Sequence, residues 1–383
     1  MITDPLLLLA ILCGSVVVSE WLARHTFLRH LGTALVVIIV VAVWANLGFI
    51  PSASQGSVVY SGIFRYLAPL AIFYLLLDVN LASVRRAGTA MLGLFVVGSL
   101  ATAVGVIAGM YVIDGHTHFG GLYPAIAGMF TGTYTGGSVN FNAVAIHYDM
   151  MREGVLYAGM TAVDNIITAV WMVVTLAVPM LLRRGRGSRV KTANAGATVH
   201  VERETESIGI VSLGLLLAMG FGALFIADRA AGQFAAIGYT VPSILILTSI
   251  ALVLAQIPWA HRLAGGQLLG LFMVYLFLAV IGAFCELAAL GQIGDLAWRL
   301  LVLVVVTVGV HGLIIGAAAF LFNIDPDVAA VASQANIGGS SSALALAKSL
   351  DRMDLYLPGI LVGALGNGLG TYLGFLVAGL LGG

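Results

Sequence analysis

The stretch TGTYTGGSVNFN, residues 131–142, carries no charge and is rich in Thr, Gly, Ser and Asn, although the chain on both sides of it is strongly apolar. Its composition is typical of a loop. Irregular backbone at membrane depth is tolerated only where protein buries it or where it lines a watery cavity, because unpaired amide groups cost several kcal/mol each in lipid. The stretch therefore predicts a helix that breaks inside a membrane.

The composition of the whole chain is that of a membrane protein. Over 383 residues it is 60% hydrophobic and 9% charged, with a mean hydropathy of +1.06, far outside the range of soluble globular proteins. A spanning helix needs about 20 apolar residues. Twelve such segments fill almost the whole chain: 5–23, 31–50, 57–81, 88–113, 119–148, 154–182, 207–227, 238–257, 264–290, 298–322, 326–349 and 354–382. The sequence therefore predicts an all-α polytopic membrane protein, and its net charge of zero gives no reason to expect a nucleic-acid partner.

One polar interruption divides the chain into two halves of similar length. RRGRGSRVKTANAGATVHVERETE, residues 183–206, is predicted to be a solvated linker between a first membrane repeat, 1–182, and a second, 207–383. Its basic start, with Arg183, Arg184 and Arg186, is predicted to lie on the cytoplasmic side.

The two halves share a motif. GTYTGGSVNFNAVAIHYDM, residues 132–150, has a counterpart in QANIGGSSSALALAKSLDR, residues 334–352, at an offset of 202 residues. Without a gap, the same offset pairs Pro124 with Pro326, Asp149 with Asp351, and Asn165 with Asn367. A chance match in Ala- and Gly-rich membrane sequence is the alternative, but shared Pro, Asp and Asn favour a duplication.

Two interruptions in corresponding positions of two halves are typical of a transporter's binding site. Glycine pairs allow the segments 119–148 and 326–349 to break, and the freed backbone groups can coordinate an ion or a substrate together with nearby polar side chains. The predicted site comprises Thr133, Thr135, Gly136, Gly137, Ser138, Asn140 and Asn142 in the first half, and Gln334, Asn336, Gly338, Gly339, Ser340, Ser341 and Ser342 in the second. The alternative is that these small residues only allow close helix packing.

The positive charges constrain the topology. If all six segments of each half crossed the membrane, the basic linker would lie on the side opposite Arg24, Arg29, Arg85 and Arg86, against the positive-inside rule. If the broken segments are re-entrant hairpins with tips at the glycine pairs, each half keeps five spans and the two halves form inverted repeats. A crossing broken helix combined with a miscounted span elsewhere is the competing interpretation.

A carboxylate at membrane depth is a functional candidate. Asp164, in YAGMTAVDNIITAVW, lies about ten residues into its segment, near the middle of the bilayer. It is the candidate ligand for Na⁺ and could exchange H⁺ for Na⁺, whereas a purely structural Asp is the alternative. Its neighbour Asn165 corresponds to Asn367 in GALGNGLGTYLG, so both halves present an amide just after the broken segment.

Other residues in apolar segments have simpler interpretations. Gly366, Gly370 and Gly374, at four-residue spacing, predict a face for close helix packing. His311 is predicted to be a satisfied core histidine, with a proton relay as the alternative, and Arg65 can extend to the membrane surface from the start of its segment.

The motifs of the common enzyme classes are absent from the sequence. GxSxG, Walker A and HExxH do not occur, and nothing suggests that Ser138 meets His147, nine residues further on. The sequence predicts neither enzymatic activity nor a cofactor.

The stretches YTGGSVNFNAVA and AVDNIITAVWM, with SQANIGGSSSALALAKS and LVGALGNGLGTYLGFLVA in the second half, resemble the YjcL-like family of bacterial and plastid membrane proteins. That family is distantly similar to cation/proton antiporters and to bile-acid, glutamate and citrate sodium symporters. The resemblance implies two broken elements that cross in a core domain, which moves against a scaffold or dimer domain. It also implies the bacterial inner (plasma) membrane, contact with membrane lipid and a possible homodimer.

By this resemblance, Asp164 and Asn165 fall where the antiporters carry an acidic pair, with an amide in place of the second acid. This departure leaves the coupling stoichiometry and the choice between Na⁺ and H⁺ open. The Gly-Gly-Ser tips fall where the symporters bind anion and Na⁺. No arginine adjoins either tip, so a carboxylate would have to rely on helix N-termini, amides and hydroxyls.

The predicted function is ion-coupled secondary transport of a small organic solute, with Na⁺ or H⁺ as the coupling ion and alternating access around the two broken elements. A Na⁺/H⁺ antiporter without an organic substrate is the first alternative. A passive channel or a non-transporting membrane scaffold is the alternative from another class.

Overall fold

The computed structural model describes residues 4–26, 32–52, 55–77, 79–186, 208–239, 241–260, 263–285 and 294–382, with Ile2 and Leu28. Every secondary-structure element in these ranges is helical, which confirms the all-α prediction. The α-helices of the first half are α1 (Pro5–His25), α2 (Gly32–Asn46), α3 (Val58–Gly62), α4 (Ala68–Leu76), α5 (Leu81–Val84), α6 (Thr89–Val112), α7 (Gly115–Phe119), α8 (Tyr123–Gly136), α9 (Ser138–His147) and α10 (Gly154–Arg186). Those of the second half are α11 (Ile210–Ala236), α12 (Ser243–Ala255), α13 (Gly266–Ala283), α14 (Gly294–Leu321), α15 (Pro326–Ser349) and α16 (Tyr356–Gly382).

Eight helices in the described part are long and apolar enough to cross a membrane: Pro5–His25, Val58–Leu76, Thr89–Val112, Gly154–Pro179, Ile210–Ala236, Gly266–Ala283, Gly294–Leu321 and Met353–Gly382. Two shorter apolar helices, Thr33–Asn46 and Ser243–Ala255, accompany them. Each of these ten helices corresponds to one of the twelve apolar segments of the sequence, and the other two segments are the broken ones. The chain is an all-α polytopic membrane protein.

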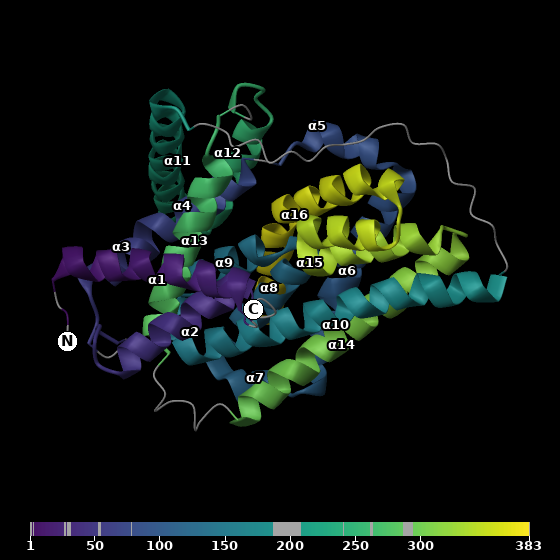
Figure 1. The fold of residues 1–383 in the computed structure, drawn as a ribbon, viewed down its shortest axis with the longest axis horizontal. Coiled ribbons are helices and arrows are strands. Elements are labelled where there is room, and N and C mark those ends of the chain that lie inside the picture. The colour runs from purple at the N-terminus through teal and green to yellow at the C-terminus, as the bar shows by residue number, and fades with distance from the viewer. Residues whose placement is uncertain are drawn as a thin grey trace.

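The helices form two groups (Figure 1). The flanking group, on the left of the figure, contains α1, α2, α3, α4, α11, α12 and α13. The hairpin group contains α6, α8, α9, α10, α14, α15 and α16, and both broken segments belong to it. The groups meet where α9 packs against α4 and α12, where α10 packs against α2 and α13, and where α16 packs against α12.

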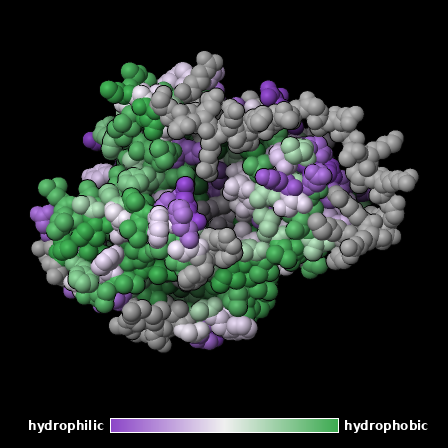
Figure 2. Space-filling model, viewed as in Figure 1, coloured by the Kyte–Doolittle hydropathy of each residue, from purple (hydrophilic) through white to green (hydrophobic). Residues whose placement is uncertain are grey.

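The outer surface is largely apolar. Figure 2 shows hydrophobic residues over most of the left and lower parts of one face, with polar residues in smaller patches. Long apolar side chains on α11 and α14 point outward, including Ile210 with 93% of its surface exposed and Leu313 with 76%. Such a surface would be unfavourable in water and suits contact with lipid tails.

The first broken segment folds back on itself. Helix α8 ends and α9 begins at Gly137, whose φ of +110° lies in a region that L side chains rarely adopt. A Cβ built at Gly132 would lie 3.1 Å from the Cβ of Asn140, and one at Gly128 would lie 3.1 Å from a methyl carbon of Val144. These contacts place α9 antiparallel to α8, so the segment is a hairpin with its tip at Gly136 and Gly137.

The second broken segment also returns toward its start. Within α15, Gly339 has a non-helical backbone with φ +74°. A Cβ built at Gly359 of α16 would lie 2.9 Å from Val331 and 3.3 Å from Ala343, which would be about 18 Å apart along a continuous helix. Both broken segments are therefore hairpins, and the structure favours the re-entrant interpretation over a crossing broken helix.

A cluster of charges closes the base of the second hairpin. Arg352, just after α15, binds Asp325 at 2.6 Å and Asp327 at 2.7 Å, at the start of the same helix, and Asp354 at 2.7 Å. Asp354, through its hydrogen bond first of all, and Asp325 raise the pKa of the Arg352 guanidinium above its usual range. The ion pairs join the two ends of the hairpin directly.

Local conformations repeat at the offset of 202 residues. Gly137 and Gly339 both have positive φ, and so do Asp149 (52°) and Asp351 (56°). The inverted orientation of the two halves, and the domain boundaries at 182 and 207, stay predictions. The linker 183–206 lies, after its first four residues, outside the described residues.

A ladder of glycines joins the first hairpin to α16. A Cβ built at Gly128 would lie 2.7 Å from the carbonyl oxygen of Gly374. A Cβ built at Gly370 would lie 2.7 Å from the carbonyl oxygen of Gly132. A Cβ built at Gly136 would lie 2.0 Å from the carbonyl carbon of Gly366. The two helices therefore pack backbone to backbone at three successive steps. This confirms the predicted close-packing face of α16.

The ladder predicts that Gly136→Ala is severely destabilising. The methyl group of alanine would have to displace the Gly366 backbone. Overpacked cores typically lose about 1–3 kcal/mol of stability, and we expect the free energy of unfolding to fall by the upper end of this range or more. Gly93→Ala on α6 is the control, because its Cβ would have no atom within 4 Å. That change should be neutral or stabilising by up to about 1 kcal/mol. Thermal unfolding of the purified variants in detergent measures both, and equal stability of the two would contradict the ladder.

Candidate functional site

The tips of the two hairpins meet. A Cβ built at Gly339 would lie 3.4 Å from the carbonyl oxygen of Gly136, and one at Gly137 would lie 4.0 Å from the Cα of Gly339. Asn367 of α16 reaches the same point, with its Oδ1 at 3.7 Å from the Cβ position of Gly137. We call this meeting point of Gly136, Gly137, Gly339 and Asn367 the hairpin junction. It brings together the glycine pairs that the sequence places 202 residues apart.

Several of the predicted site residues beside the junction are accessible. Ser138 and Ser341 are exposed, and Gly338, Ser340, Ser342 and Asn367 are partly exposed. Their hydroxyl and amide groups can reach a solute or an ion from outside the packed interior.

Two predicted ligands of the first hairpin are engaged in holding it in place. Asn140 is buried, donates to the carbonyl oxygen of Gly366 at 3.1 Å and accepts from the Thr371 hydroxyl at 2.8 Å. Asn142 accepts a hydrogen bond from the Tyr157 hydroxyl of α10. These amides therefore fix the hairpin to α16 and α10.

The two threonines of the prediction are buried in the same hairpin. Thr133 and Thr135 are both enclosed, and the Thr135 hydroxyl donates to the carbonyl oxygen of Thr131 at 2.8 Å. Their backbone carbonyls are engaged as well, since Thr133 accepts from the amide of Gly137 at 2.7 Å.

The amides of the second hairpin are only partly satisfied. Asn336 donates to the Ser99 hydroxyl at 3.0 Å and to the carbonyl oxygen of Thr135 at 3.2 Å, and so joins the second hairpin to α6 and to the first hairpin. Gln334 accepts from the Thr175 hydroxyl at 3.3 Å. Among the described residues, the buried Oδ1 of Asn336 and Nε2 of Gln334 have no hydrogen-bond partner.

Asp164 of α10 lies beside the first hairpin. Its carboxyl group interacts with the hydroxyl of Tyr134, two residues before Gly136, and also with Tyr157. No hydrogen bond of ordinary geometry joins these side chains: in the described part of the chain, the Tyr134 hydroxyl and the buried Asp164 Oδ1 are both unpartnered.

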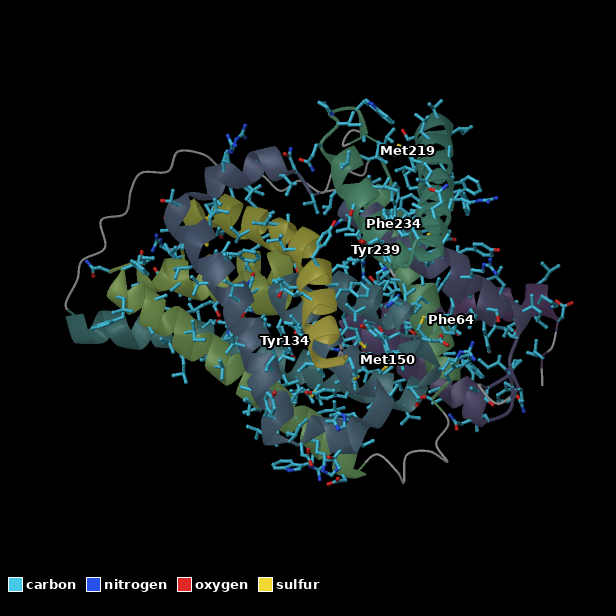
Figure 3. The ribbon with its side chains drawn as sticks, turned by 180° about the vertical axis from the view of Figure 1, so that it is seen from behind. Phe64, Tyr134, Met150, Met219, Phe234 and Tyr239 are labelled. Atoms are coloured by element: carbon cyan, nitrogen blue, oxygen red, sulfur yellow. The ribbon has the colours of Figure 1, made fainter. Side chains whose placement is uncertain are left out.

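Tyr134 lies within the hairpin group, whereas Phe64 lies across in the flanking group (Figure 3). Asn165, the residue after Asp164, is partly exposed.

His311 of α14 is fully buried in a complete hydrogen-bond network. Its Nδ1 lies 3.0 Å from both the carbonyl oxygen of Gly98 and the Thr102 hydroxyl, and its Nε2 lies 2.9 Å from the Ser333 hydroxyl. The Thr102 hydroxyl donates to the carbonyl oxygen of Tyr134, and Trp171 donates to Ser333. These partners assign the proton to Nδ1, and each ring nitrogen has a protein partner. The histidine joins α6, α14 and both hairpins, as a satisfied core histidine would.

Sequence reasoning missed Tyr134, Tyr157, Ser99, Thr102 and Ser333 as members of this polar centre. Tyr134 lies inside the TGTYTGGSVNFN stretch and could have been found as a hydroxyl among its polar neighbours. Ser99 and Thr102 stand singly in an apolar helix, where such residues usually bond their own backbone. Nothing in the sequence pattern singles them out.

The geometry predicts different effects for two neighbouring polar residues. Asn140→Ala should lower the free energy of unfolding by about 1–3 kcal/mol, because it leaves the buried Thr371 hydroxyl without its acceptor and opens a gap at α16. Ser138→Ala, at an exposed position, should change it by less than about 0.5 kcal/mol. Urea or thermal unfolding of the two variants gives the comparison. If Asn140→Ala unfolds like the wild type, the hydrogen bonds of Asn140 to Gly366 and Thr371 of α16 contribute nothing to stability.

Comparison with known proteins places this fold in a family. The family described as "Protein of unknown function (DUF819)" matches residues 7–382. The "Uncharacterized membrane protein YjcL" of Bacillus subtilis (strain 168) is 28% identical over 350 residues, which cover 87% of this chain and 85% of that protein. The chain therefore belongs to the DUF819 family, of YjcL-like membrane proteins.

Proposed function

We propose that this membrane protein is a secondary active transporter that couples Na⁺ or H⁺ to the movement of a small organic solute. The observation that carries the proposal is a set of four buried polar atoms on the two hairpins and the adjoining helix α10: the Tyr134 hydroxyl, Asp164 Oδ1, Gln334 Nε2 and Asn336 Oδ1. Among the described residues, none has a hydrogen-bond partner. Each such atom costs about 1–3 kcal/mol when left unpaired, so the presence of four of them within the hairpin group supports a bound ion or solute there.

The chemistry of these groups suits a small hard cation. Carboxylate, amide and hydroxyl oxygens are the ligands that such cations prefer. Asp164 would supply the negative charge, and carbonyl groups released where the helices break could add further oxygens. Asp164 can alternatively carry a proton, so the arrangement supports coupling to either ion.

The division into two groups supports alternating access. Both hairpins and Asp164 belong to the hairpin group, so an ion site there would move as a unit against the flanking group. The expected homodimer would use the flanking group, and the expected location is the bacterial inner membrane. These expectations come from the expected likeness to cation/proton antiporters and sodium symporters, and that likeness is itself part of the proposal.

Two other functions remain as alternatives with distinct outcomes. A Na⁺/H⁺ antiporter would carry ion flux in proteoliposomes without any solute, whereas a solute-coupled transporter would need solute to stimulate ion flux. A passive channel or a membrane scaffold would be favoured if Asp164→Asn and Gly137→Leu left all flux and all ligand-induced stability changes intact.

The first test is thermal stability of the purified protein in Na⁺, in K⁺ and across a range of pH. A ligand that binds only the folded state stabilises it by mass action, by about 2.7 kcal/mol at a concentration 100 times its Kd. We expect Na⁺ but not K⁺ to stabilise the wild type, and Asp164→Asn to abolish the effect. Asp295→Asn is the control, since this exposed carboxylate at the start of α14 pairs with Arg299 instead. It should keep the full response to Na⁺.

Other outcomes change the proposal in defined ways. A pH-dependent stability change that Asp164→Asn removes, without a Na⁺ effect, would assign coupling to protons. Indifference to Na⁺ and pH in the wild type would contradict ion coupling at Asp164 and make this residue structural.

A further inference from the structure

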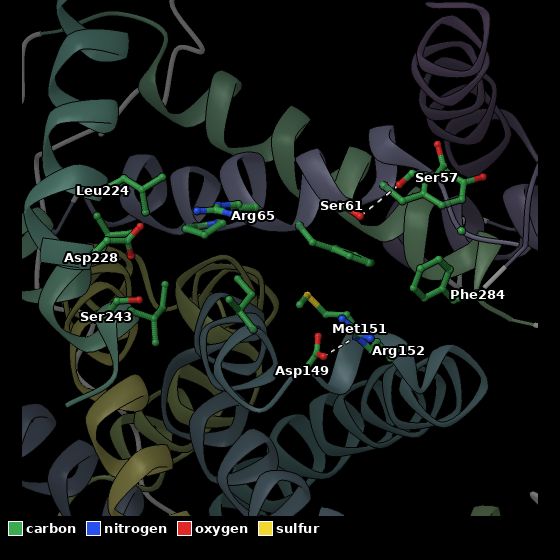
Figure 4. A pocket seen from close by; sticks show the side chains of 17 residues that line it. Ser57, Ser61, Arg65, Asp149, Met151, Arg152, Leu224, Asp228, Ser243 and Phe284 are labelled. Carbon is green, nitrogen blue, oxygen red and sulfur yellow. Dashed lines mark hydrogen bonds and ion pairs between the residues drawn. The ribbon is translucent and has the colours of Figure 1, made fainter. Parts of the chain in front are cut away.

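A second polar feature lies between the two groups of helices. It is a cavity of about 620 Å³, within the range of small-molecule sites. The flanking group supplies most of its wall from α3, α4, α11 and α12, and the hairpin group supplies Ile146 and the turn after α9. None of the predicted site residues lines it. Figure 4 shows the lining side chains around the open space.

Arg65 lies on one wall, inside a membrane-spanning segment. It is seven residues beyond Val58, at the centre of a π-helical turn (Ile63–Leu67) that interrupts the span Val58–Leu76. Single π turns occur frequently at functional sites. The side chain lines the cavity and is exposed. Its extension to the membrane surface stays a prediction. Within the described part of the chain, its guanidinium makes no ion pair and has only the adjacent Tyr66 ring near it, at 5.6 Å.

Asp228 faces the cavity from α11, eight residues before the end of that helix. Its neighbour Arg229 points elsewhere, over the ring of Phe225 at 5.3 Å. In the described ranges, no cation pairs with Asp228. Asp228 is exposed and directly follows the apolar segment 207–227, so water or a ligand can reach its carboxylate.

The other two charges of the cavity neutralise each other. Arg152 binds Asp149 at 2.5 Å, and Figure 4 marks this pair with a dashed line. No such line joins Arg65 to Asp228, although both point into the open space. The cavity thus offers one cation and one anion, on separate helices, that the described residues leave unpaired. An anionic solute would leave Asp228 unpaired, and a cationic solute would leave Arg65 unpaired.

We propose that this cavity binds a small zwitterionic solute of the amino-acid type, with its carboxylate on Arg65 and its ammonium group on Asp228. A guanidinium can hold a carboxylate through two parallel hydrogen bonds. The apolar parts of the wall, including Phe64, Pro69, Leu224 and Leu247, can cover an apolar body between or beside the charged ends. The inference rests on the proposed transport function and names its substrate class.

The test uses matched probes added to the purified wild-type protein, with thermal stability and calorimetric binding as readouts. Leucine and 6-aminohexanoate carry both charges at different separations. The probes 4-methylpentanoate and 3-methylbutylammonium are leucine without its ammonium and without its carboxylate. We expect at least one zwitterion to bind and each single-charge probe to bind about tenfold or more weakly, because each has lost a charge-assisted contact.

Variants locate the site. Arg65→Gln and Asp228→Asn should each weaken zwitterion binding by about tenfold or more. Arg229→Gln removes a charge from the position next to Asp228 but outside the cavity lining, so it should leave binding unchanged. Na⁺ stabilisation measured on the same variants should persist, which would show that they are folded.

Several results would overturn the inference. These are no binding of either zwitterion, equal binding of 4-methylpentanoate and leucine, or an Arg229→Gln effect as large as that of Asp228→Asn. If the Asp164-dependent Na⁺ response is present in such a case, the proposed ion coupling stands and only the substrate class is wrong. If zwitterion binding follows Arg65 and Asp228 while Na⁺ and pH have no effect, the cavity site stands and ion coupling fails.

Discussion

At each step of the glycine ladder, a peptide group of one helix occupies the space that a side chain of the other would fill. This contact sets how deep the first hairpin enters the protein, because the ladder ends where Gly136 meets Gly366. The next residue of each helix, Gly137 and Asn367, then lies at the junction. Asn140 reinforces the same register through Gly366 and Thr371. The position of the candidate site therefore depends on backbone packing between α8 and α16.

The second hairpin is held by a different set of contacts. At its base, Arg352 binds the fully buried Asp327, and removing one partner of a buried pair typically costs about 3–5 kcal/mol. Nearer the tip, polar bonds from Ser333 and Asn336 connect it to His311, Ser99 and the first hairpin. Hydrogen-bonded amides can exchange a protein partner for an ion or a solute, whereas close-packed glycines cannot. The unsatisfied atoms of Gln334 and Asn336 thus lie in a hairpin that is held near its tip by contacts of this exchangeable kind.

The sequence predicts those features that depend on local composition. Apolar length gives the spans, the glycine pairs give the breaks at Gly137 and Gly339, and four-residue spacing gives the packing face of α16. The partners of the polar residues could not be predicted, because they lie on distant helices. Asn140 looks like a ligand in the sequence, yet it is engaged by α16 across 226 residues. Likewise, a charge in an apolar segment marks Arg65 as unusual without showing that it shares a cavity with Asp228.

The two polar features belong to different parts of the fold, which bears on the proposed mechanism. Asp164 and the junction are in the hairpin group, whereas Arg65 and Asp228 are both in the flanking group. The cavity wall nevertheless includes Ile146 of the first hairpin, so a shift of the hairpin group would reshape the cavity and move the junction together. A solute held by Arg65 and Asp228 would stay with the flanking group during such a shift. Its release toward the junction would then depend on the position of the hairpin group. An ion at Asp164 could bias that position. The ion site and the solute site would thus be linked without direct contact between them.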